Sequence, residues 1–495
     1  MRRAAFPDGL LEESVEIGAV SHRSVRVWVR KPHRVWISGT LSIDDEVVAR
    51  AEAALSEETD WTGVLVFVLV TPQPRVPFQI NVDGVVRAAR FAPEPGTITG
   101  LTFGFGSCNR PFKLEDGDVV YNQAAGIYTA LSQDLESSDA RFMLLAGDQI
   151  YSDELDPISV RAADRNQHML PPPLEELVTA YRHVSRGYLG VPGFMRLRQT
   201  TPTYTIWDDH DIFDNWGSRK DVSDLDARMF EAAARVYADY QHARNPGRQA
   251  GGPPFHYEFT YGDIGFLVLD VRSKRDWRSG QLLGEEQWQN IVAYLDETMR
   301  GPLRTLFVVT TVPVAHVARW MTVLFERMPS KFGDSVRDRW PASAFRAQRD
   351  ALLEKLIEWQ RAAPRRQVIV LSGDVHVAGA YTVRPSEGPG KVEQFTSSAF
   401  TTPLSSFERY LNVFAARGAN LSEPDWRFTR HFISYANNGG LVRLTPLAGG
   451  GHHVELLIRG WNPLRGELHT VERYAALPDG VNDPIPVAGT RRRAT

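Results

Sequence analysis

The chain has 495 residues, too many for one ordinary hydrophobic core, so its length predicts two or three domains. Hydrophobic residues make up 43% and charged residues 23%, as in a typical globular protein, and a formal net charge of -4 argues against a nucleic-acid complex. The single cysteine, Cys108, excludes an intrachain disulfide.

The N-terminus does not have the pattern of an export signal. Arg2 and Arg3 are followed by no apolar stretch, because Glu12 and Glu13 interrupt the next leucines. The sequence also shows no run of residues that is apolar and long enough for a transmembrane helix. We therefore predict a cytoplasmic protein, or an exported one if a leader has been removed.

Residues 1–95 are predicted to form a small all-β domain. Residues 24–30 alternate between apolar and polar side chains, which is the period of a half-buried strand. Further strands are predicted at 36–41, 63–70 and 77–84, and the last of these ends in the Asp-Gly of a tight turn. Short strands at this spacing favour a sandwich, for which we expect a structural role.

From residue 97 onward, strands and helices alternate, which indicates an α/β domain over residues 96–475. The last residues, 476–495, are expected to form a loose tail. The apolar stretch 316–328 fits core packing better than a lid or surface helix. The predicted helices are 121–135, 174–189, 224–244, 285–299 and 342–363, and predicted strands include 142–146, 255–261, 264–270, 306–312, 392–398, 441–446 and 454–458.

Four apolar runs each end in residues that bind metals. Cys108 follows the first run, Asp148 and Tyr151 follow the second, Asp208 to Asp211 follow the third, and Asp374 and His376 follow the fourth. Open α/β sheets bind ligands just beyond the carboxyl ends of their strands. The sequence therefore predicts that the four strand ends converge on a metal centre.

The residues after the first two apolar runs, Cys108, Asp148 and Tyr151, suit a hard trivalent or a zinc-type ion. The carboxylate of Asp148 can bridge two cations, and a phenolate at Tyr151 favours a hard ion such as ferric iron. Each motif alone has a simpler explanation. Asp148 could cap a turn, and Cys108 could be a small buried hydrophobe or a nucleophile.

The acidic motif is harder to explain without a cation. Asp208, Asp209 and Asp211 lie within four residues and repel one another unless cations or hydrogen bonds stabilise them. Asp214 and Asn215 add oxygen ligands of the kind that Ca²⁺ or Mg²⁺ prefers. Two adjacent metals are a known arrangement for phosphoryl displacement, in which one of them activates a hydroxide.

Taken together, the four motifs resemble the alkaline phosphatase D (PhoD-like) family, within the wider calcineurin-like metallophosphoesterases. Residues 269–275 and 283–288 also look like segments of that family, and the N-terminal strands look like its fibronectin-like sandwich. The resemblance implies a four-layer α/β/β/α catalytic domain. It also implies a phosphatase or phosphodiesterase that cleaves small-molecule, lipid or nucleotide phosphate esters by attack of a metal-activated hydroxide.

The resemblance also assigns roles to individual residues. The implied cofactors are Fe³⁺ and Ca²⁺, with Zn²⁺, Mn²⁺ or Mg²⁺ as alternative ions. His210 would stabilise the transition state or protonate the leaving oxygen, Arg110 would meet a phosphate oxygen, and Asn109 is a further catalytic candidate. The implied ligands are Cys108, Asp148, Tyr151 and His376 for iron, and Asp148, Asp208, Asp209, Asn215 and Asp374 for the second ion.

Two features depart from the family pattern. Asp214-Asn215 stands where the family usually has two asparagines, so Asn215 is the stronger candidate ligand of the pair. Many relatives are exported, whereas no leader is visible here. Two alternative hypotheses remain, namely a hydrolase of another ester or anhydride with the same metals, and a metal-binding protein of the same fold that has no turnover.

Overall fold

The structure is a computed structural model that describes residues 5–115, 118–152, 172–218, 222–247, 252–316, 319–328, 331–402 and 420–481. Among these residues, no helix combines the length and the apolar character that crossing a membrane would require.

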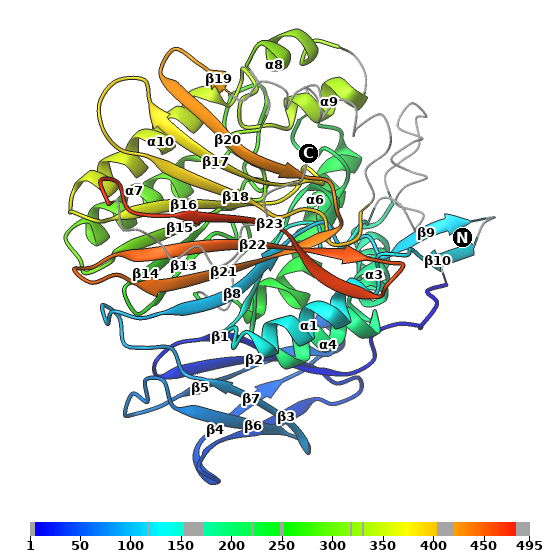
Figure 1. The fold of residues 1–495 in the computed structure, drawn as a ribbon. Helices are drawn as coiled ribbons and strands as arrows, with labels where there is room; N and C mark the ends of the chain where they lie inside the picture. Colours follow the sequence, from blue (N-terminus) through cyan, green and yellow to red (C-terminus); the bar gives the residue numbers. More distant parts are fainter. Residues whose placement is uncertain are drawn as a thin grey trace.

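The N-terminal region is all-β, as the sequence predicts (Figure 1). Its strands form a three-stranded sheet in the order β1-β2-β5 and a four-stranded sheet in the order β4-β3-β6-β7. Side chains of both sheets share one buried core, and Asp83 and Gly84 have the positive φ angles of a tight hairpin turn between β6 and β7. The strands are β1 (Ser14–Val20), β2 (Ser24–Arg30), β3 (Trp36–Ile43), β4 (Glu46–Ala54), β5 (Thr62–Val68), β6 (Pro77–Val82) and β7 (Val85–Arg90).

Two larger sheets form the rest of the molecule. The six-stranded sheet has the order β12-β11-β8-β21-β22-β23, and the eight-stranded sheet has the order β13-β14-β15-β16-β18-β17-β20-β19. Their strands are β8 (Leu101–Gly106), β11 (Met143–Ala146), β12 (Thr203–Ile206), β13 (Tyr257–Tyr261), β14 (Ile264–Val268), β15 (Thr305–Val309), β16 (Gln367–Ser372), β17 (Ala378–Pro385), β18 (Val392–Thr396), β19 (Asn420–Ser422), β20 (Trp426–Ser434), β21 (Asn438–Pro446), β22 (His452–Asn462) and β23 (Glu467–Ala476).

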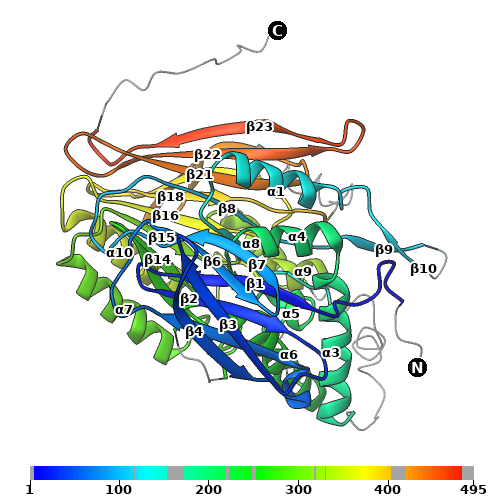
Figure 2. The same ribbon diagram turned by 90° about the horizontal axis from the view of Figure 1, so that it is seen from below.

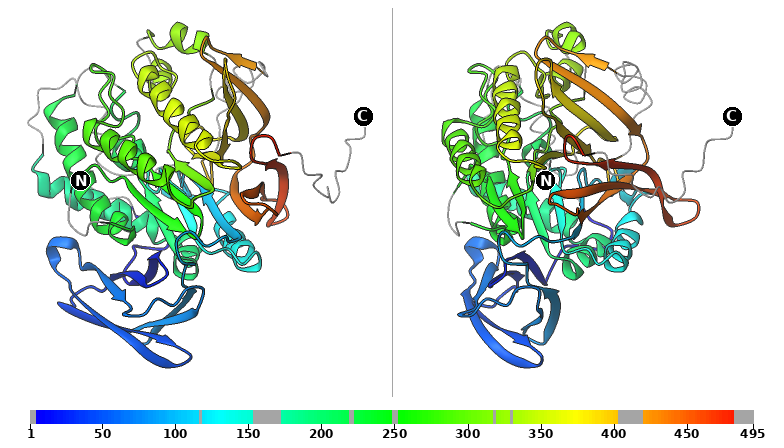
Figure 3. Two further views of the ribbon diagram at one scale, coloured as in Figure 1. Left: turned by 90° about the vertical axis from the view of Figure 1, so that its left-hand side faces the viewer. Right: turned by 60° about the vertical axis from the view of Figure 1, so that its left-hand side comes forward.

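The two sheets pack against each other, and helices cover their outer faces, which gives the four-layer α/β/β/α arrangement (Figure 3). Side chains along β14 alternate between two cores, as the period of a strand requires. Phe266 packs into the core between the sheets and stacks on Phe307 of β15 with the ring centres 5.0 Å apart. Leu267 points the other way, into the core shared with Ile291 of the helix α7 (Glu285–Met299).

Helices α4 and α6 lie beside the N-terminal sheets and α3 packs on α6, whereas the single turn α5 lies at the strand ends that carry the acidic motif (Figures 1 and 2). The helix α10 packs with α7 against the eight-stranded sheet, whereas α1 covers the six-stranded sheet through Leu131 and Leu135. The helices are α1 (Ile127–Ser137), α3 (Leu174–Leu189), α4 (Pro192–Thr200), α5 (Asp209–Ile212), α6 (Asp224–Tyr240), α8 (Arg319–Phe325), α9 (Lys331–Arg337) and α10 (Arg346–Arg361).

A buried ion cluster joins the N-terminal region to the layers above it. Glu16 of β1 has no exposed surface and accepts hydrogen bonds from Arg198 of α4, with distances of 3.1 and 2.9 Å to Nε and Nη2. Arg244 also donates to Glu16. Next to the cluster, Trp28 donates its indole N–H to the carbonyl of Asp239 at 2.8 Å. The two regions are therefore joined by charged and hydrogen-bonded groups that water does not reach.

Three sequence predictions differ from the structure in detail. The predicted helix 121–135 begins only at Ile127, because Tyr121 ends the strand β10 (Asp118–Tyr121), which pairs with β9 (Phe112–Glu115). The stretch 316–328 was predicted to be core, yet Leu324 is 58% exposed. The predicted tail begins at the last residue of β23, and residues 482–495 lie outside the described part of the chain. The domain boundaries remain predictions.

Candidate metal centre

The four motifs predicted to converge do lie at the carboxyl ends of parallel strands. Cys108 follows β8, Asp148 follows β11 and Asp208 follows β12, and these three strands run parallel in the six-stranded sheet. Asp374 follows β16 in the facing sheet. Both sheets therefore present their strand ends to the same place, so that residues far apart in sequence become neighbours.

Two glycines allow these strand ends to approach closely. Gly147 has a φ of +95°, and a Cβ atom there would lie 2.6 Å from the Cβ of Asp208. A Cβ on Gly373 would lie 2.5 Å from the Cβ of Ser107. Neither position can accept a side chain without moving the turn that carries a candidate ligand.

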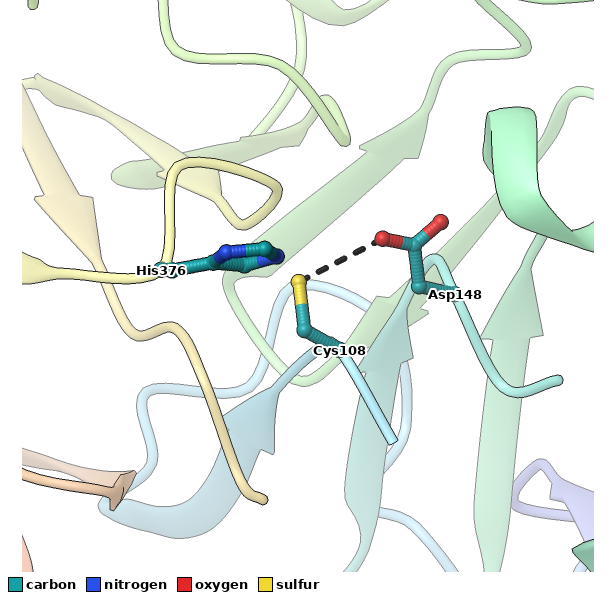
Figure 4. A group of neighbouring side chains, drawn as sticks. All are labelled: Cys108, Asp148 and His376. Atoms are coloured by element: carbon teal, nitrogen blue, oxygen red, sulfur yellow. Dashed lines mark hydrogen bonds between the residues drawn. The ribbon is translucent and has the colours of Figure 1, made fainter. Parts of the chain in front are cut away.

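The first group consists of Cys108, Asp148 and His376, whose ligand atoms all lie within 4.8 Å of one another. In Figure 4 the imidazole and the carboxylate lie on opposite sides of the sulfur, and the thiol donates to Asp148 Oδ2 at 3.4 Å. The Tyr151 hydroxyl joins this group, 3.4 Å from Asp148 Oδ2 and 3.5 Å from His376 Nε2. These four residues are those that the resemblance assigns to an iron-type ion.

The second group consists of four carboxylates, those of Asp148, Asp208, Asp209 and Asp374, again with ligand atoms within 4.8 Å of one another. Asp208 Oδ1 accepts hydrogen bonds from Arg272 and from the hydroxyl of Thr311, the latter at 2.7 Å. Asp208 Oδ2 is buried and has no hydrogen-bond partner among the described residues. A buried, unpartnered carboxylate oxygen on a member of a group of four carboxylates is the environment that a bound cation would satisfy.

The pKa values point the same way. Burial, together with the negative charge of Asp209, raises the pKa of Asp148 well above its ordinary value. Burial raises the pKa of Asp208 to about 6, although the charge of Arg272 opposes the shift. Burial and the carboxylate of Asp148 likewise raise the pKa of the Cys108 thiol. The ionised forms of these ligands are therefore unfavourable as the protein stands, and a bound cation would make them favourable. The residues fit a two-cation site.

His210 and Arg110 lie at the edge of the first group, where partial exposure would allow contact with a substrate. The His210 ring stacks on the Tyr151 ring with centres 4.1 Å apart, and its side chain is 15% exposed. His210 Nε2 lies 4.0 Å from Asp214 Oδ1. The guanidinium carbon of Arg110 lies 5.9 Å from the centre of the Tyr151 ring.

Asn109 has a different environment. It is fully buried, its amide donates to the carbonyl of Gln149 at 2.8 Å, and its Oδ1 accepts from the hydroxyl of Tyr128. These bonds use both ends of the side chain and favour a positioning role over contact with substrate.

Asn215 is brought to the second group by its backbone, because its N–H donates to Asp209 Oδ2 at 2.6 Å. Its side-chain nitrogen donates to Asp214 at 2.7 Å, which leaves the carbonyl Oδ1 as the atom suited to a cation. Asp214 also forms a third group of candidate ligands with Asp209 and His210. The structure thus brings Asn215 and Asp214 to the same place as the acidic motif.

Other residues that contact the site include Asp211, which the sequence places in the acidic motif, and Arg272, Asp338 and Arg339, to which the sequence analysis gives no role. Asp211 Oδ2 accepts from the backbone N–H groups of Asp148 and Asp208, both at 2.9 Å, and so fixes two of the ligand turns. Arg339 is paired with Asp374. Arg272 and Asp338 form a bidentate pair behind the acidic motif. A basic residue two positions after the strand-end Asp270 is the one sequence signal that could have drawn attention to Arg272.

Comparisons with known proteins agree with this geometry. A family model described as PhoD-like phosphatase matches residues 107–428. The solved structure of PhoD aligns with 97% of this chain and 91% of its own, with a TM-score of 0.67 and 16% sequence identity. The purple acid phosphatase PPD1 from yellow lupin (Lupinus luteus) seeds aligns with 94% of this chain and 74% of its own, with a TM-score of 0.58 and 13% identity. At these identities the likeness establishes the fold. A search of curated proteins found no match.

Proposed function

Because this chain belongs to the PhoD-like phosphatase family, we propose that it is a metal-dependent phosphoesterase that hydrolyses phosphate monoesters or diesters. The observation that carries the proposal is the buried, unpartnered Oδ2 of Asp208 within a group of four carboxylates, directly beside the Cys108 group. Two adjacent cation sites of different ligand chemistry suit in-line displacement at phosphorus. Small-molecule, lipid and nucleotide phosphate esters are the substrate class.

The donor sets favour different ions at the two sites. Cys108, Tyr151, Asp148 and His376 combine thiolate, phenolate, carboxylate and imidazole, a set that suits ferric iron. The second set is entirely oxygen, which suits Ca²⁺, and consists of Asp148, Asp208, Asp209, Asn215 and Asp374. When bound, these ions would lower the pKa of an attacking water and neutralise charge on the phosphate oxygens.

The remaining residues act on the substrate directly or hold the residues that do. His210 is the group that donates a proton to the leaving oxygen, because its ring is partly exposed and its backbone N–H anchors it to Asp148 Oδ1 at 3.3 Å. Arg110, whose guanidinium lies beside Tyr151, is the side chain that would contact a phosphate oxygen. Asn109 holds the turn after β8 to the turn after β11.

Hydrolysis of paired chromogenic substrates tests the proposal. p-Nitrophenyl phosphate and bis(p-nitrophenyl) phosphate are compared before chelation, after chelation, and after Ca²⁺ is restored. We expect activity to disappear on chelation, to return with Ca²⁺, and to be absent in Asp148→Ala, because Asp148 belongs to both ligand groups. Glu46→Ala, at an exposed position of β4, is the control and should keep full activity.

The ratio of the two rates then distinguishes a monoesterase from a diesterase. If protein that contains iron and calcium by elemental analysis cleaves neither ester, the phosphoesterase proposal fails. Activity that survives complete chelation would contradict the metal dependence.

A further inference from the structure

We propose that Arg272 is a positioning residue that orients Asp208 and Asp209 toward the second cation and sets that site for a divalent rather than a trivalent ion. The inference rests on the proposed function, because it concerns the cation site which that function requires. Arg272 belongs to none of the four strand-end motifs. Its side chain cannot itself be a metal ligand, since a guanidinium has no acceptor atom.

The guanidinium of Arg272 is fixed on every side. It is completely buried, and its Nε donates to Asp208 Oδ1. Its Nη2 donates to Asp209 Oδ1 at 3.3 Å, and the two Nη atoms together hold Asp338, at 2.6 and 2.8 Å. Nη1 also donates to the carbonyl of Trp216 at 3.3 Å. The planar fork therefore ties two carboxylates of the acidic motif, those of Asp208 and Asp209, to the carboxylate of Asp338 behind them.

This contact restrains the carboxylate of Asp208. Oδ1 accepts hydrogen bonds from Arg272 and Thr311, so the carboxylate cannot rotate freely, and Oδ2 is left without a hydrogen-bond partner among the described residues. A lysine at position 272 would keep the positive charge but could not hold Asp208, Asp209 and Asp338 at once.

The guanidinium also changes the charge that a cation meets. The second group carries four carboxylates, and three of them accept a hydrogen bond from an arginine, Asp208 and Asp209 from Arg272 and Asp374 from Arg339. Four negative and two positive charges leave two negative charges, which a divalent ion balances. Asp338 does not alter this balance, because its own charge is met by Arg275, 3.4 Å away.

The charge of Arg272 predicts opposite changes in ion preference for Arg272→Met and Asp338→Asn. Arg272→Met removes a positive charge and should shift preference toward a trivalent ion by at least about tenfold, since each further charge on the ion is attracted by the added negative charge. Asp338→Asn removes the carboxylate that Arg272 and Arg275 share, so the surroundings of the site become more positive and preference should shift toward the divalent ion. Arg272→Lys should weaken binding of both ions by about 10- to 100-fold, as is usual when the support of a metal ligand is lost.

The experiment measures ion binding rather than activity. Dissociation constants for Ca²⁺ and for Tb³⁺ are determined by calorimetry and by terbium luminescence on full-length protein stripped of calcium. The same measurements are made on the three variants. Arg349→Met is the matched control, because Arg349 is equally buried and bridges two carboxylates, Asp350 and Glu423, that belong to no candidate ligand group. Thermal unfolding confirms that each variant is folded.

The expected result is an opposite shift of the Tb³⁺/Ca²⁺ ratio in Arg272→Met and Asp338→Asn, with no shift in the control. Equal ratios in all variants, or shifts of the same sign, would overturn the proposal for Arg272 while leaving the proposed function intact. If the wild-type protein binds neither ion, it is the proposed function that fails. Should Arg272→Met not fold, Asp338→Asn still decides through the Tb³⁺/Ca²⁺ ratio and Arg272→Lys through the dissociation constants of both ions, since a purely structural role predicts no change in the ratio for the first and no loss of affinity for the second.

Discussion

The buried Glu16 cluster offers a direct test of how the N-terminal sheets are attached to the rest of the chain. Burial alone would raise the pKa of Glu16, but the charges and hydrogen bonds of Arg198 and Arg244 outweigh it and lower the pKa from 4.5 to about 2. This difference corresponds to about 3 kcal/mol of folding stability at neutral pH. Because the pKa is lower in the folded state, the contribution is complete above pH 4.5 and is lost as the pH falls toward 2.

Glu16→Gln should therefore lower the free energy of unfolding by about 3–5 kcal/mol at pH 7.5, since two buried guanidinium groups lose their carboxylate. Urea unfolding followed by circular dichroism measures the change. Glu46→Gln, at an exposed position on β4, should alter stability by less than about 0.5 kcal/mol. The difference between wild type and Glu16→Gln should also shrink between pH 5 and pH 3.

Either of two results would refute this reasoning. One is a Glu16→Gln variant within about 1 kcal/mol of the wild type at pH 7.5, well short of the cost of unpairing a buried charge. The other is a difference that stays constant as Glu16 approaches protonation.

Three further predictions concern the metal centre. Tyr151→Phe should remove the visible absorption of a tyrosinate–iron centre while leaving the fold intact, and absorption that survives would exclude Tyr151 as an iron ligand. Gly147→Ala should destabilise the protein by about 2 kcal/mol or more in urea unfolding and weaken Ca²⁺ binding, because the new Cβ meets that of Asp208. Its control is Gly466→Ala, because Gly466 also has a positive φ but open space around it. Equal losses of stability in the two variants would mean that backbone strain alone, and not the contact with Asp208, explains the effect. Tyr128→Phe leaves the buried Asn109 Oδ1 without its donor and should cost about 1–3 kcal/mol, measured in the same way, whereas an unchanged stability would contradict the positioning role of Asn109.

The strand ends could be predicted from sequence because each combines an apolar run with polar residues directly after it. A buried strand explains the run, and only a site explains why Asp148, Asp208 and Asp374 follow at once. The convergence of Asp148 and Asp208 needed no contact information, since the carboxyl ends of parallel strands in one sheet share one edge, whereas Asp374 reaches the same place from the facing sheet. The α/β class and the all-β N-terminal region followed from the same periodicities.

The residues that hold the candidate ligands in place could not be predicted from the sequence. Arg272 and Asp338 are 66 positions apart, and although Arg272 lies in the family-like segment 269–275, no pattern in the sequence connects either side chain with the metal ligands. Their pairing appears only when β14 and the segment after α9 meet in three dimensions. The missed start of α1 has a similar cause. The Tyr121 ring packs on Phe112 of the neighbouring strand, with centres 5.1 Å apart, so an apolar spacing that suits a helix is satisfied by a hairpin.

The position of β8 in its sheet has a consequence for how the protein is made. The strand that leads to Cys108 is flanked on one side by β11, which follows soon after it, and on the other by β21 (Asn438–Pro446), which follows only after the strands of the facing sheet. While the chain is being synthesised, that second edge of β8 stays open until β21 has left the ribosome. The backbone groups on that edge of the cysteine strand thus stay unpaired during synthesis of the whole intervening segment, which makes slow maturation and a need for chaperones the expected behaviour of this fold.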